Sequence, residues 1–268
     1  MMNQLMLEGA RSAIHTRISA LGFETDTKHQ LAETVLGWLN TIQPRQGVTT
    51  NRLITYLNPH VYNLSMHDVD VKHCLEIADR VCIDGVGIKL AILLLRRQRV
   101  PRVVAEHLFN DFVNKLKTPT QAIIIGTHAD ELKAASWALQ QHNENLSITD
   151  TLNGFAALED YRNFLQHNRH IPLVLIGAGT PKSEKIALIA MRECRGSVVF
   201  HIGAGTLKTW AGTKRRGPAL MSRLGLEWLH RIVYEPHTRT RYTLGGLRFI
   251  RHLVSGYKSQ PQQQGEQP

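Results

Sequence analysis

The stretch IPLVLIGAGTPKSEKIALIAMREC, residues 171–194, decides the fold class of this chain. Its first part, 171–179, is a continuous apolar run that ends in glycines, a pattern typical of strands that are buried on both faces. The rest has helical spacing, with Thr180 as the expected cap and Pro181 in the first turn. A buried strand that leads directly into a helix is the repeating unit of a parallel α/β sheet.

The same alternation extends along the chain in both directions. QAIIIGT (121–127) is a second continuous apolar run, and Thr127 with Asp130 is a capping pair for a helix over 129–142. This alternation predicts an α/β domain with a mainly parallel, Rossmann-like sheet flanked by helices. The other predicted elements are a helix over 27–42 after Thr27, a strand at 47–51, a strand ending at Asp84 and a helix after it within 78–97, a helix over 103–116, a strand at 147–151, a helix over 156–167 and a strand at 197–203.

Length and composition are those of a folded protein. With 268 residues, of which 43% are apolar, the chain can bury a large core. We divide it into an α/β domain over 1–206, a basic helical appendage over 207–254 and a tail over 255–268. The tail, SGYKSQPQQQGEQP, is too polar to bury apolar surface, and we expect it to be disordered.

Positive charge is concentrated near the C-terminal end of the sequence. The formal net charge is +10, and the segment from Lys208 to Lys258 carries eleven Lys and Arg residues but only two acids. Such a block predicts an anionic partner, which is nucleic acid, an anionic membrane surface or a phosphorylated substrate. Nucleic acid is disfavoured because few aromatic side chains stand among the arginines for base stacking.

Apolar residues at helical spacing accompany these arginines. They predict two basic amphipathic helices, and that arrangement favours a membrane interface over a DNA groove. The alternative is that the apolar faces pack on the domain and leave the arginines solvated. The apolar positions are Leu220, Leu224, Leu229, Ile232 and Val233 in the first helix, and Leu247, Ile250, Leu253 and Val254 in the second.

Cysteine usage indicates a reducing, cytoplasmic compartment. Cys74, Cys82 and Cys194 are odd in number and form no Cys-x-x-Cys pair, so neither a disulfide framework nor a zinc site is predicted. The sequence has no signal-peptide core and no window of the roughly 18 apolar residues that a spanning helix needs. Any membrane attachment is therefore expected to be peripheral.

Three predicted strand ends carry glycine-rich turns, at 82–87, 124–130 and 175–184. In parallel sheets, ligands bind beyond the carboxyl ends of the strands. Glycine lets the backbone approach a phosphate, and the N-terminus of the next helix favours negative charge. We therefore expect a substrate that carries a nucleotide.

The common nucleotide and metal motifs are incomplete. The segment 85–90 lacks the third glycine of the dinucleotide motif, and in 203–209 Leu207 stands where a P-loop needs glycine. Asp68 and Asp70 have a metal-binding spacing, but acids are also common at a helix start. The fourteen histidines show no ligand spacing supported by cysteine or further acids. We therefore predict neither a metal nor a cofactor.

Asp84 is the candidate catalytic base. It ends a predicted buried strand and is followed by Gly85 and Gly87, so its carboxylate is expected at the ligand-binding edge. There it can accept a proton from an attacking hydroxyl group, provided that partial burial raises its pKa. The alternative is that this carboxylate caps the following helix.

Several segments resemble the WecG/TagA/CpsF family of glycosyltransferases. They are IDGVGIKLA (83–91), LNGF (152–155), LIGAGTPKSEK (175–185) and WAGTKRRGPALMSRLGLEWLHRIVYEP (210–236). The resemblance runs from Thr49 to Tyr242, and its most specific part is the block GLEWLHR at 225–231.

The resemblance implies an inverting transfer of a sugar from a UDP-sugar to a saccharide on undecaprenyl diphosphate, without a metal or cofactor. The sugar is of N-acetylmannosamine, N-acetylmannosaminuronic acid or glucose type, and the product enters teichoic acid, common antigen, capsule or exopolysaccharide. The implied location is peripheral, on the inner face of the cell membrane, and a homo-oligomer is left open. A non-catalytic, membrane-associated protein of the same fold that binds a sugar nucleotide is the alternative.

The resemblance also assigns roles to particular residues. Asp84 matches the catalytic base, and Thr49 with Asn51 matches a Thr-x-Asn strand end near the sugar. Arg216 and Arg231 match arginines of a C-terminal appendage that closes over the diphosphate. The full set of predicted substrate-binding residues is Thr49, Asn51, Gly85, Gly126, Asn153, Gly177, Gly179, Pro181, Lys182, Glu184, Arg216, Glu227, Arg231 and Arg239.

The sequence departs from the family pattern at four positions near the predicted donor pocket. Ala105 replaces a glycine, His107 and Lys208 each replace an aspartate, and Ser183 replaces a glutamine. These replacements bear on which donor sugar is accepted.

Overall fold

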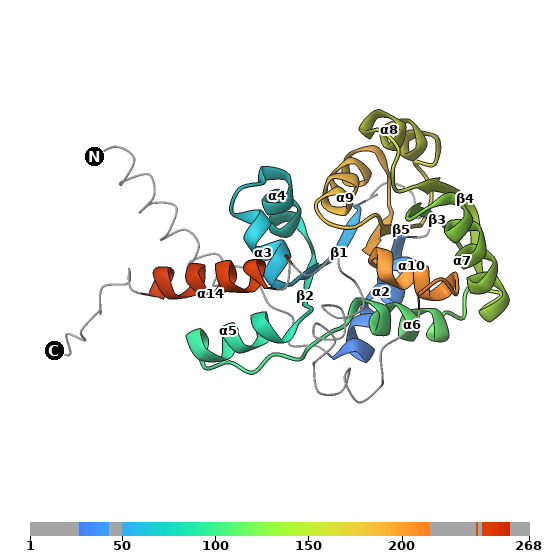
Figure 1. Cartoon of the computed structure of the whole chain (residues 1–268). Coiled ribbons are helices and arrows are strands. Elements are labelled where there is room, and N and C mark those ends of the chain that lie inside the picture. The colour runs from blue at the N-terminus through green and yellow to red at the C-terminus, as the bar shows by residue number, and fades with distance from the viewer. Residues whose placement is uncertain (1–26, 43–49, 215–239, 241–242, 258–268) are drawn as a thin grey trace.

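The protein, described here by a computed structural model, is built on one parallel sheet of six strands in the order β2-β1-β6-β5-β3-β4 (Figure 1). The structure describes residues 27–42, 50–214, 240 and 243–257. The predicted α/β class is confirmed. The strands are β1 Arg52–Leu57, β2 Arg80–Ile83, β3 Thr120–Gly126, β4 Leu146–Asn153, β5 Leu173–Gly177 and β6 Val198–His201. The helices are α2 Lys28–Ile42, α3 Pro59–Ser65, α4 Val69–Ile77, α5 Val86–Arg96, α6 Ala105–Lys115, α7 Ala129–His142, α8 Leu158–His167, α9 Lys182–Glu193, α10 Ala204–Trp210 and α14 Leu244–Tyr257.

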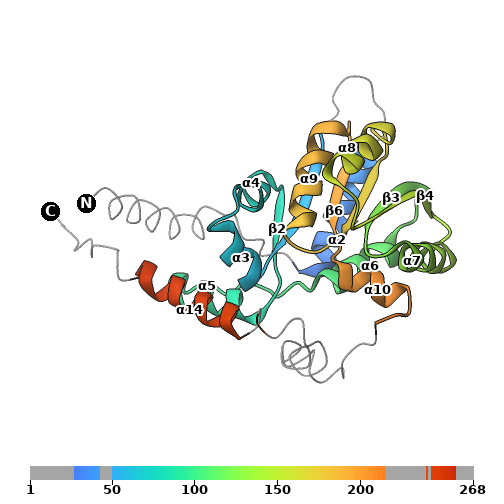
Figure 2. The ribbon, with the colours of Figure 1, turned by 45° about the horizontal axis from the view of Figure 1, so that its top comes forward.

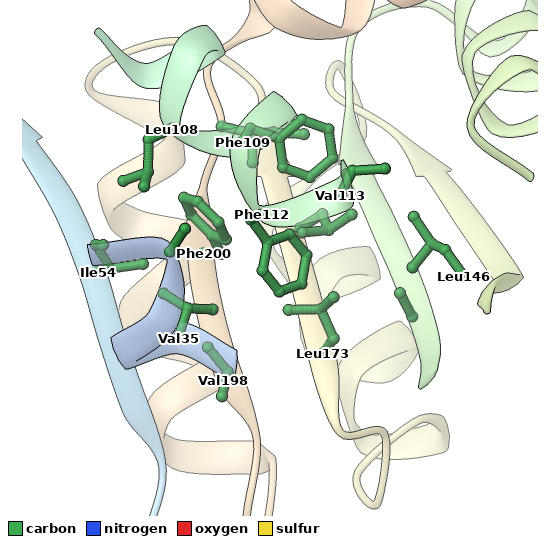
Figure 3. Close-up of a cluster of buried hydrophobic side chains, with 14 of the residues drawn as sticks. Val35, Ile54, Leu108, Phe109, Phe112, Val113, Leu146, Leu173, Val198 and Phe200 are labelled. Atoms are coloured by element: carbon green, nitrogen blue, oxygen red, sulfur yellow. The ribbon is translucent and has the colours of Figure 1, made fainter. Parts of the chain in front are cut away.

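Successive side chains of the strands point to opposite faces, and each face has its own apolar core. Helices α2, α6, α7 and α10 cover one face. There Phe109, Phe112 and Phe200 meet with ring centroids between 5.8 and 6.3 Å apart (Figure 3). Helices α4, α8 and α9 cover the other face, around Tyr161 and Ile186. Because both faces are covered, the loops at the strand ends are the place for a ligand.

The chain reverses its winding between β3 and β5. From β3 it continues through α7 to the edge strand β4, whereas from β5 it continues through α9 to β6 in the opposite direction. Helices α7 and α9 accordingly lie on opposite faces of the sheet. In open parallel sheets, a ligand binds beyond the carboxyl ends of the strands at such a switch point.

The strand predicted at 47–51 is wrong. β1 begins at Arg52 and is buried from Leu53 to Leu57, between β2 and β6. The first part of the predicted segment, 47–49, lies outside the described residues, and residues 50–51 precede the strand. The physical reason is burial, since Thr50 is exposed and Asn51 is half-buried, whereas Leu53 to Leu57 are buried.

The caps of two predicted helices can be compared directly. Thr27 directly precedes α2, as predicted for its cap, and its backbone N–H donates to the side chain of Gln30 at 2.8 Å. At α7 the predicted pairing of Thr127 with Asp130 is wrong, because the hydroxyl group of Thr127 donates to Glu131. Glu131 is one position further along the first turn, where its carboxylate reaches back to the start of the helix.

A third apolar cluster lies at the β2 end of the sheet, where α3, α4, α5 and α14 meet (Figure 1). The predicted last helix is present as α14. It docks through Phe249, which is 4% exposed and meets the ring of Tyr62 edge to face at 5.3 Å. The predicted apolar residues Leu247 and Ile250 are 64% and 56% exposed. The alternative of packing on the domain therefore does not hold for Leu247 and Ile250, although the helix does pack through Phe249. The side chains of Leu253 and Val254 lie outside the described part of the structure.

Two predicted boundaries also shift. Helix α14 continues through Tyr257, so the first residues of the tail at 255–268 are helical, and the rest lies outside the described residues. Helix α10 crosses the division expected after residue 206, and Leu207 within it is fully buried against the sheet. Among the described helices, none is long and apolar enough to cross a membrane.

Candidate active site

Asp84 lies at the carboxyl end of β2, beside the last residue of β1. Its backbone N–H donates to the carbonyl oxygen of Leu57 at 2.9 Å, so the pairing of the two strands holds it in place. Gly85 follows with φ of 114°, a conformation that favours glycine, and it occupies the N-cap position of α5. The half-buried Asp84 side chain therefore stands where a buried strand turns into a helix.

Two residues of the neighbouring β1 segment accompany Asp84. Burial raises the pKa of Tyr56 well above its usual value, and the nearby Cys82 and Asp84 raise it further, so this phenol stays neutral. Asn58 follows β1 and caps α3, because its side-chain oxygen accepts from two backbone N–H groups at 3.0 and 3.1 Å. Asn58 was not among the residues predicted from the sequence. Asn before Pro59, after an apolar run, is a helix-start signal that could have identified it.

His201 ends β6 and links three elements at this edge. Its Nδ1 lies 2.8 Å from the hydroxyl oxygen of Thr55 in β1, and its Nε2 lies 3.1 Å from the carbonyl oxygen of Ser183 in α9. Because a carbonyl oxygen only accepts, Nε2 carries the proton and Nδ1 accepts from Thr55. Burial lowers the pKa of His201 to about 4, so the ring is neutral. A polar residue at the end of a buried strand was the available sequence signal.

In the turn between β5 and α9, Gly179 borders open space, whereas Thr180 is hydrogen-bonded to a buried carboxylate. Gly179 has φ of 80°, and no atom lies within 4 Å of the place where a Cβ atom would be. Pro181 takes the N-cap position, whereas the predicted cap Thr180 donates its hydroxyl hydrogen to Glu184 at 2.9 Å. Glu184 is only 2% exposed, so its carboxylate closes this turn from inside.

Gly126 and Gly177 end β3 and β5 at the switch point, and packing explains both. A Cβ atom on Gly126 would lie 2.5 Å from the carbonyl oxygen of Gly177, and one on Gly177 would lie 2.5 Å from Leu207. The side chain of Leu207 fills the space over both strand ends. Close packing therefore already requires glycine at these two positions, and their predicted role in binding a phosphate stays a prediction.

The turn after β4 brings two predicted residues together. Asn153 accepts from the backbone N–H of Phe155 at 2.9 Å, and the Lys182 ammonium group donates to the carbonyl oxygen of Gly154 at 2.8 Å. The same ammonium group lies 5.3 Å from the centre of the Phe155 ring. His128 stacks on that ring with centroids 4.4 Å apart. This exposed aromatic pair was not predicted from the sequence, because its two residues lie in loops that follow separate strands.

The structure does not bring Asn51 to this edge. Its side chain donates to the carbonyl oxygens of Met191 and Cys194 at 3.0 and 2.9 Å and accepts from the backbone N–H of Ser197 at 2.9 Å. These contacts lie at the amino end of β1, so the expected position near a sugar is wrong. The other predicted residues, Thr49, Arg216, Glu227, Arg231 and Arg239, lie outside the described residues.

Helix capping accounts for Asp68 and Asp70. The Asp68 carboxylate accepts from the backbone N–H groups of Asp70 and Val71 at 3.0 and 3.1 Å, which makes it the N-cap of α4. The Lys185 ammonium group lies 3.8 Å from Asp68 and 3.6 Å from Asp70. Within the part of the chain that the structure describes, no three metal-ligating side chains are grouped.

The four departures from the family pattern have definite positions. Ser183 is buried, and its hydroxyl oxygen accepts from a backbone N–H of the turn before α9 at 3.1 Å. The Lys208 ammonium group lies 4.0 Å from Glu131, so it connects α10 with the start of α7. Ala105 and His107 lie in the first turn of α6.

The carboxyl edge thus carries two groups of side chains. We call the first the Asp84 group (Asp84, Asn58, Thr55 and His201), over β2, β1 and β6. The second is the switch-point group (Asn153, Phe155, His128, Lys182 and Gly179), over β3, β4 and β5. Three strand spacings separate β2 from β5, which is about 14 Å. The class of protein is therefore a parallel α/β protein with two groups of residues at the carboxyl edge of its sheet, one of which holds the carboxylate of Asp84 between a strand and a helix.

Comparison with known proteins gives the family. The chain belongs to the glycosyl transferase WecG/TagA/CpsF family, whose sequence profile matches residues 17–263. It is 24% identical over 220 residues to an N-acetylglucosaminyldiphosphoundecaprenol N-acetyl-beta-D-mannosaminyltransferase of Staphylococcus aureus strain NCTC 8325 / PS 47, covering 81% of this chain and 84% of the relative. The protein of the same name from strain MRSA252 has the same identity and coverage. The protein is a glycosyltransferase, as the resemblance implied.

Proposed function

We propose that this glycosyltransferase moves a sugar from a UDP-sugar to a saccharide carried on undecaprenyl diphosphate. Its family supports the reaction class, and the names of its relatives support the acceptor, since they are N-acetylglucosaminyldiphosphoundecaprenol N-acetyl-beta-D-mannosaminyltransferases. Among the donor sugars considered, these names favour N-acetylmannosamine over N-acetylmannosaminuronic acid or glucose.

The observation that carries the mechanism is the position of Asp84. Its backbone is held by β1, and its half-buried carboxylate stands at the edge where ligands of parallel sheets bind. The acceptor hydroxyl oxygen attacks the anomeric carbon as the bond from that carbon to UDP breaks, and Asp84 takes the hydroxyl proton. Attack from the face opposite UDP inverts the anomeric configuration.

The donor is proposed to lie across the two groups, with its nucleotide at the switch-point group and its sugar beside Asp84. The departing diphosphate gains negative charge, which cationic and N–H groups stabilise. Lys182 and the open turn at Gly179 are suited to this role. By resemblance, Arg216 and Arg231 supply further positive charge from the appendage.

The acceptor chemistry supports a location at the membrane. An undecaprenyl chain stays in the bilayer, so the enzyme works at its surface, and we propose the inner face of the cell membrane. The product is a longer lipid-linked saccharide of the kind used for teichoic acid, common antigen, capsule or exopolysaccharide.

Replacing the base is the direct test. Asp84→Asn keeps the size and shape of the side chain but removes the proton acceptor, so we expect turnover to fall by a factor on the order of 10² to 10⁴. Turnover is measured as UDP released from a panel of UDP-sugars in the presence of a water-soluble analogue of the lipid-linked monosaccharide.

The matched control is Asp150→Asn. Asp150 is a half-buried aspartate of the edge strand β4, and its oxygens accept from Thr151 and Asn168 rather than face a substrate. Its turnover should stay near the wild-type value. Full activity of Asp84→Asn would remove Asp84 from the chemistry. Binding of UDP-sugars by the wild type without any release of UDP would favour a non-catalytic binding protein.

A further inference from the structure

Helix α5 carries a stripe of exposed apolar side chains that nothing in the proposed mechanism uses. Val86, Leu90 and Leu94 are 42%, 51% and 70% exposed. They recur every four residues and so lie along one side of the helix. The opposite side is buried through Ile88 and Ile92 in the cluster at the β2 end. Helix α5 therefore has apolar residues on both its buried side and its exposed side.

Basic residues accompany this stripe. Lys89 lies within α5, and Arg97 and Arg99 follow directly after it, all three exposed. The described residues from Val86 to Arg99 contain no Asp or Glu. A helix with an exposed apolar side and cationic neighbours is typical of helices that lie in the interface of an anionic bilayer.

Helix α14 has the same combination and touches α5. Leu247 and Ile250 are exposed, and Arg248 and Arg251 beside them are exposed as well. A Cβ atom on Gly87 of α5 would lie 3.5 Å from the ring of Phe249, so the two helices meet at the start of α5. Figure 2 shows both helices together at the end of the molecule away from α7 and α8.

We propose that α5, together with α14, rests on the anionic phospholipid surface and that α5 thereby brings Asp84 to the membrane. This inference rests on the proposed function, and it adds a membrane contact from the α/β domain itself. The Asp84 carboxylate is two residues before Val86, the first exposed apolar residue of the stripe. A lipid-linked acceptor keeps its diphosphate at the bilayer surface, so its first sugar then lies close to the base.

The charges favour a bilayer over a second copy of the chain. In a symmetric dimer the same patch appears on both partners, so Lys89, Arg97 and Arg99 would face one another. Like charges brought together in this way are unfavourable, whereas anionic lipid headgroups complement them. A bilayer also accepts the apolar side chains between the charges.

The experiment compares two double variants of the full chain. In the first, Leu90→Gln and Leu94→Gln remove the apolar stripe. In the second, Trp137→Gln and Leu158→Gln remove exposed apolar side chains of α7 and α8, which are 67% and 53% exposed. Binding is measured by sedimentation with vesicles of phosphatidylcholine containing phosphatidylglycerol, and with vesicles of phosphatidylcholine alone.

We expect the α5 variant to lose roughly tenfold in partition to the anionic vesicles, because two exposed leucines no longer enter the interface. The control variant should bind as the wild type does, and all proteins should bind pure phosphatidylcholine more weakly. Equal vesicle binding by the α5 variant and the wild type would overturn the inference. Light scattering that shows a wild-type dimer and a monomeric α5 variant would overturn it in favour of a contact between copies.

Two further measurements keep the result interpretable. Circular dichroism checks folding, and the single variant Leu94→Gln, at the most exposed position of the stripe, replaces the double variant if that one is unstable. Transfer to the water-soluble acceptor tests the proposed function alone. A wild type that transfers sugar but does not bind vesicles overturns only the membrane inference, whereas one that binds vesicles but transfers nothing overturns only the proposed function.

Discussion

The switch point and the β2 end of the sheet differ in how far their apolar side chains are buried. At the switch point, Leu207 closes the space over Gly126 and Gly177, and the strand ends touch without room for a side chain. At the β2 end, α5 and α14 dock through buried residues yet leave Leu94 and Leu247 largely exposed. One end has its apolar groups packed inside the protein, and the other presents them outward.

We propose that this difference serves two roles, nucleotide binding at the switch point and membrane contact at the β2 end. A nucleotide site depends on a fixed arrangement of turns, which close packing provides because few alternative positions fit. A surface that meets a fluid bilayer needs exposed apolar and cationic groups rather than a fixed partner. Asp84 belongs to the β2 end, where it follows a strand paired with β1 and is separated from α5 by Gly85 alone.

The largest expected effect is on stability and concerns the closely packed switch point. Gly126→Ala places a Cβ atom 2.5 Å from the carbonyl oxygen of Gly177, where backbone must move. We expect the free energy of unfolding to fall by roughly 4 kcal/mol, measured by urea denaturation. Gly37→Ala is the matched control, because nothing lies within 4 Å of its Cβ position and alanine favours a helix by up to about 1 kcal/mol. A Gly126→Ala protein as stable as the wild type would show that the strand ends can separate. The switch point would then not be the closely packed end of the sheet.

The next effect concerns His201, which joins the Asp84 group to α9. Its pKa falls from the usual 6.5 to about 4 in the folded protein, so the unfolded chain takes up a proton first as pH falls. The stability from neutral His201 is complete above pH 6.5 and is lost as pH falls toward 4, by about 3 kcal/mol.

The measurement is the free energy of unfolding across this pH range. His201→Gln should be less stable than the wild type at pH 7 and should lose this part of the pH dependence. His73→Gln changes an exposed histidine and should leave the pH dependence intact. An unchanged slope in His201→Gln would mean that other groups cause the acid sensitivity.

The smallest expected effect is on the local stability of α14 at the β2 end of the sheet. Phe249→Ala removes the buried anchor of α14, and we expect about 2 kcal/mol less protection of that helix against local opening. Hydrogen exchange of the α14 amides measures this change, and the core strands should keep their protection. Leu247→Ala alters the exposed side of the same helix and should change protection by less than about 0.5 kcal/mol. Equal effects of the two variants would contradict the assignment of a docked and a free side.

Much of the fold could be predicted because parallel strands buried on both faces are unbroken apolar runs. From Ala122 to Gly126 in β3, and throughout β5, no polar residue interrupts the run, so both strands could be recognised. β1 did not, because Thr55 interrupts it. That hydroxyl group is satisfied by His201, 146 residues away, and no local pattern indicates such a partner.

The site was predicted only in part. The position of Asp84 could be predicted because the end of a strand before Gly85 is a local feature, and its role as the base stays a prediction. Asn51 was misplaced because its position relative to the sheet depends on where β1 begins. The aromatic pair of His128 and Phe155 was missed because the two residues follow different strands and meet only when β3 and β4 pair.

By itself, the sequence determined the α/β class, most of its helices and strands, the candidate base and the resemblance to a glycosyltransferase family. These depend on residues that are close together along the chain. Only the tertiary structure decided the strand order, the use of Gly126 and Gly177 for packing and the outward stripe on α5. The physical reason is that packing and exposure depend on which distant segments come into contact. The local sequence around an apolar residue such as Leu94 does not indicate whether that residue is buried or exposed.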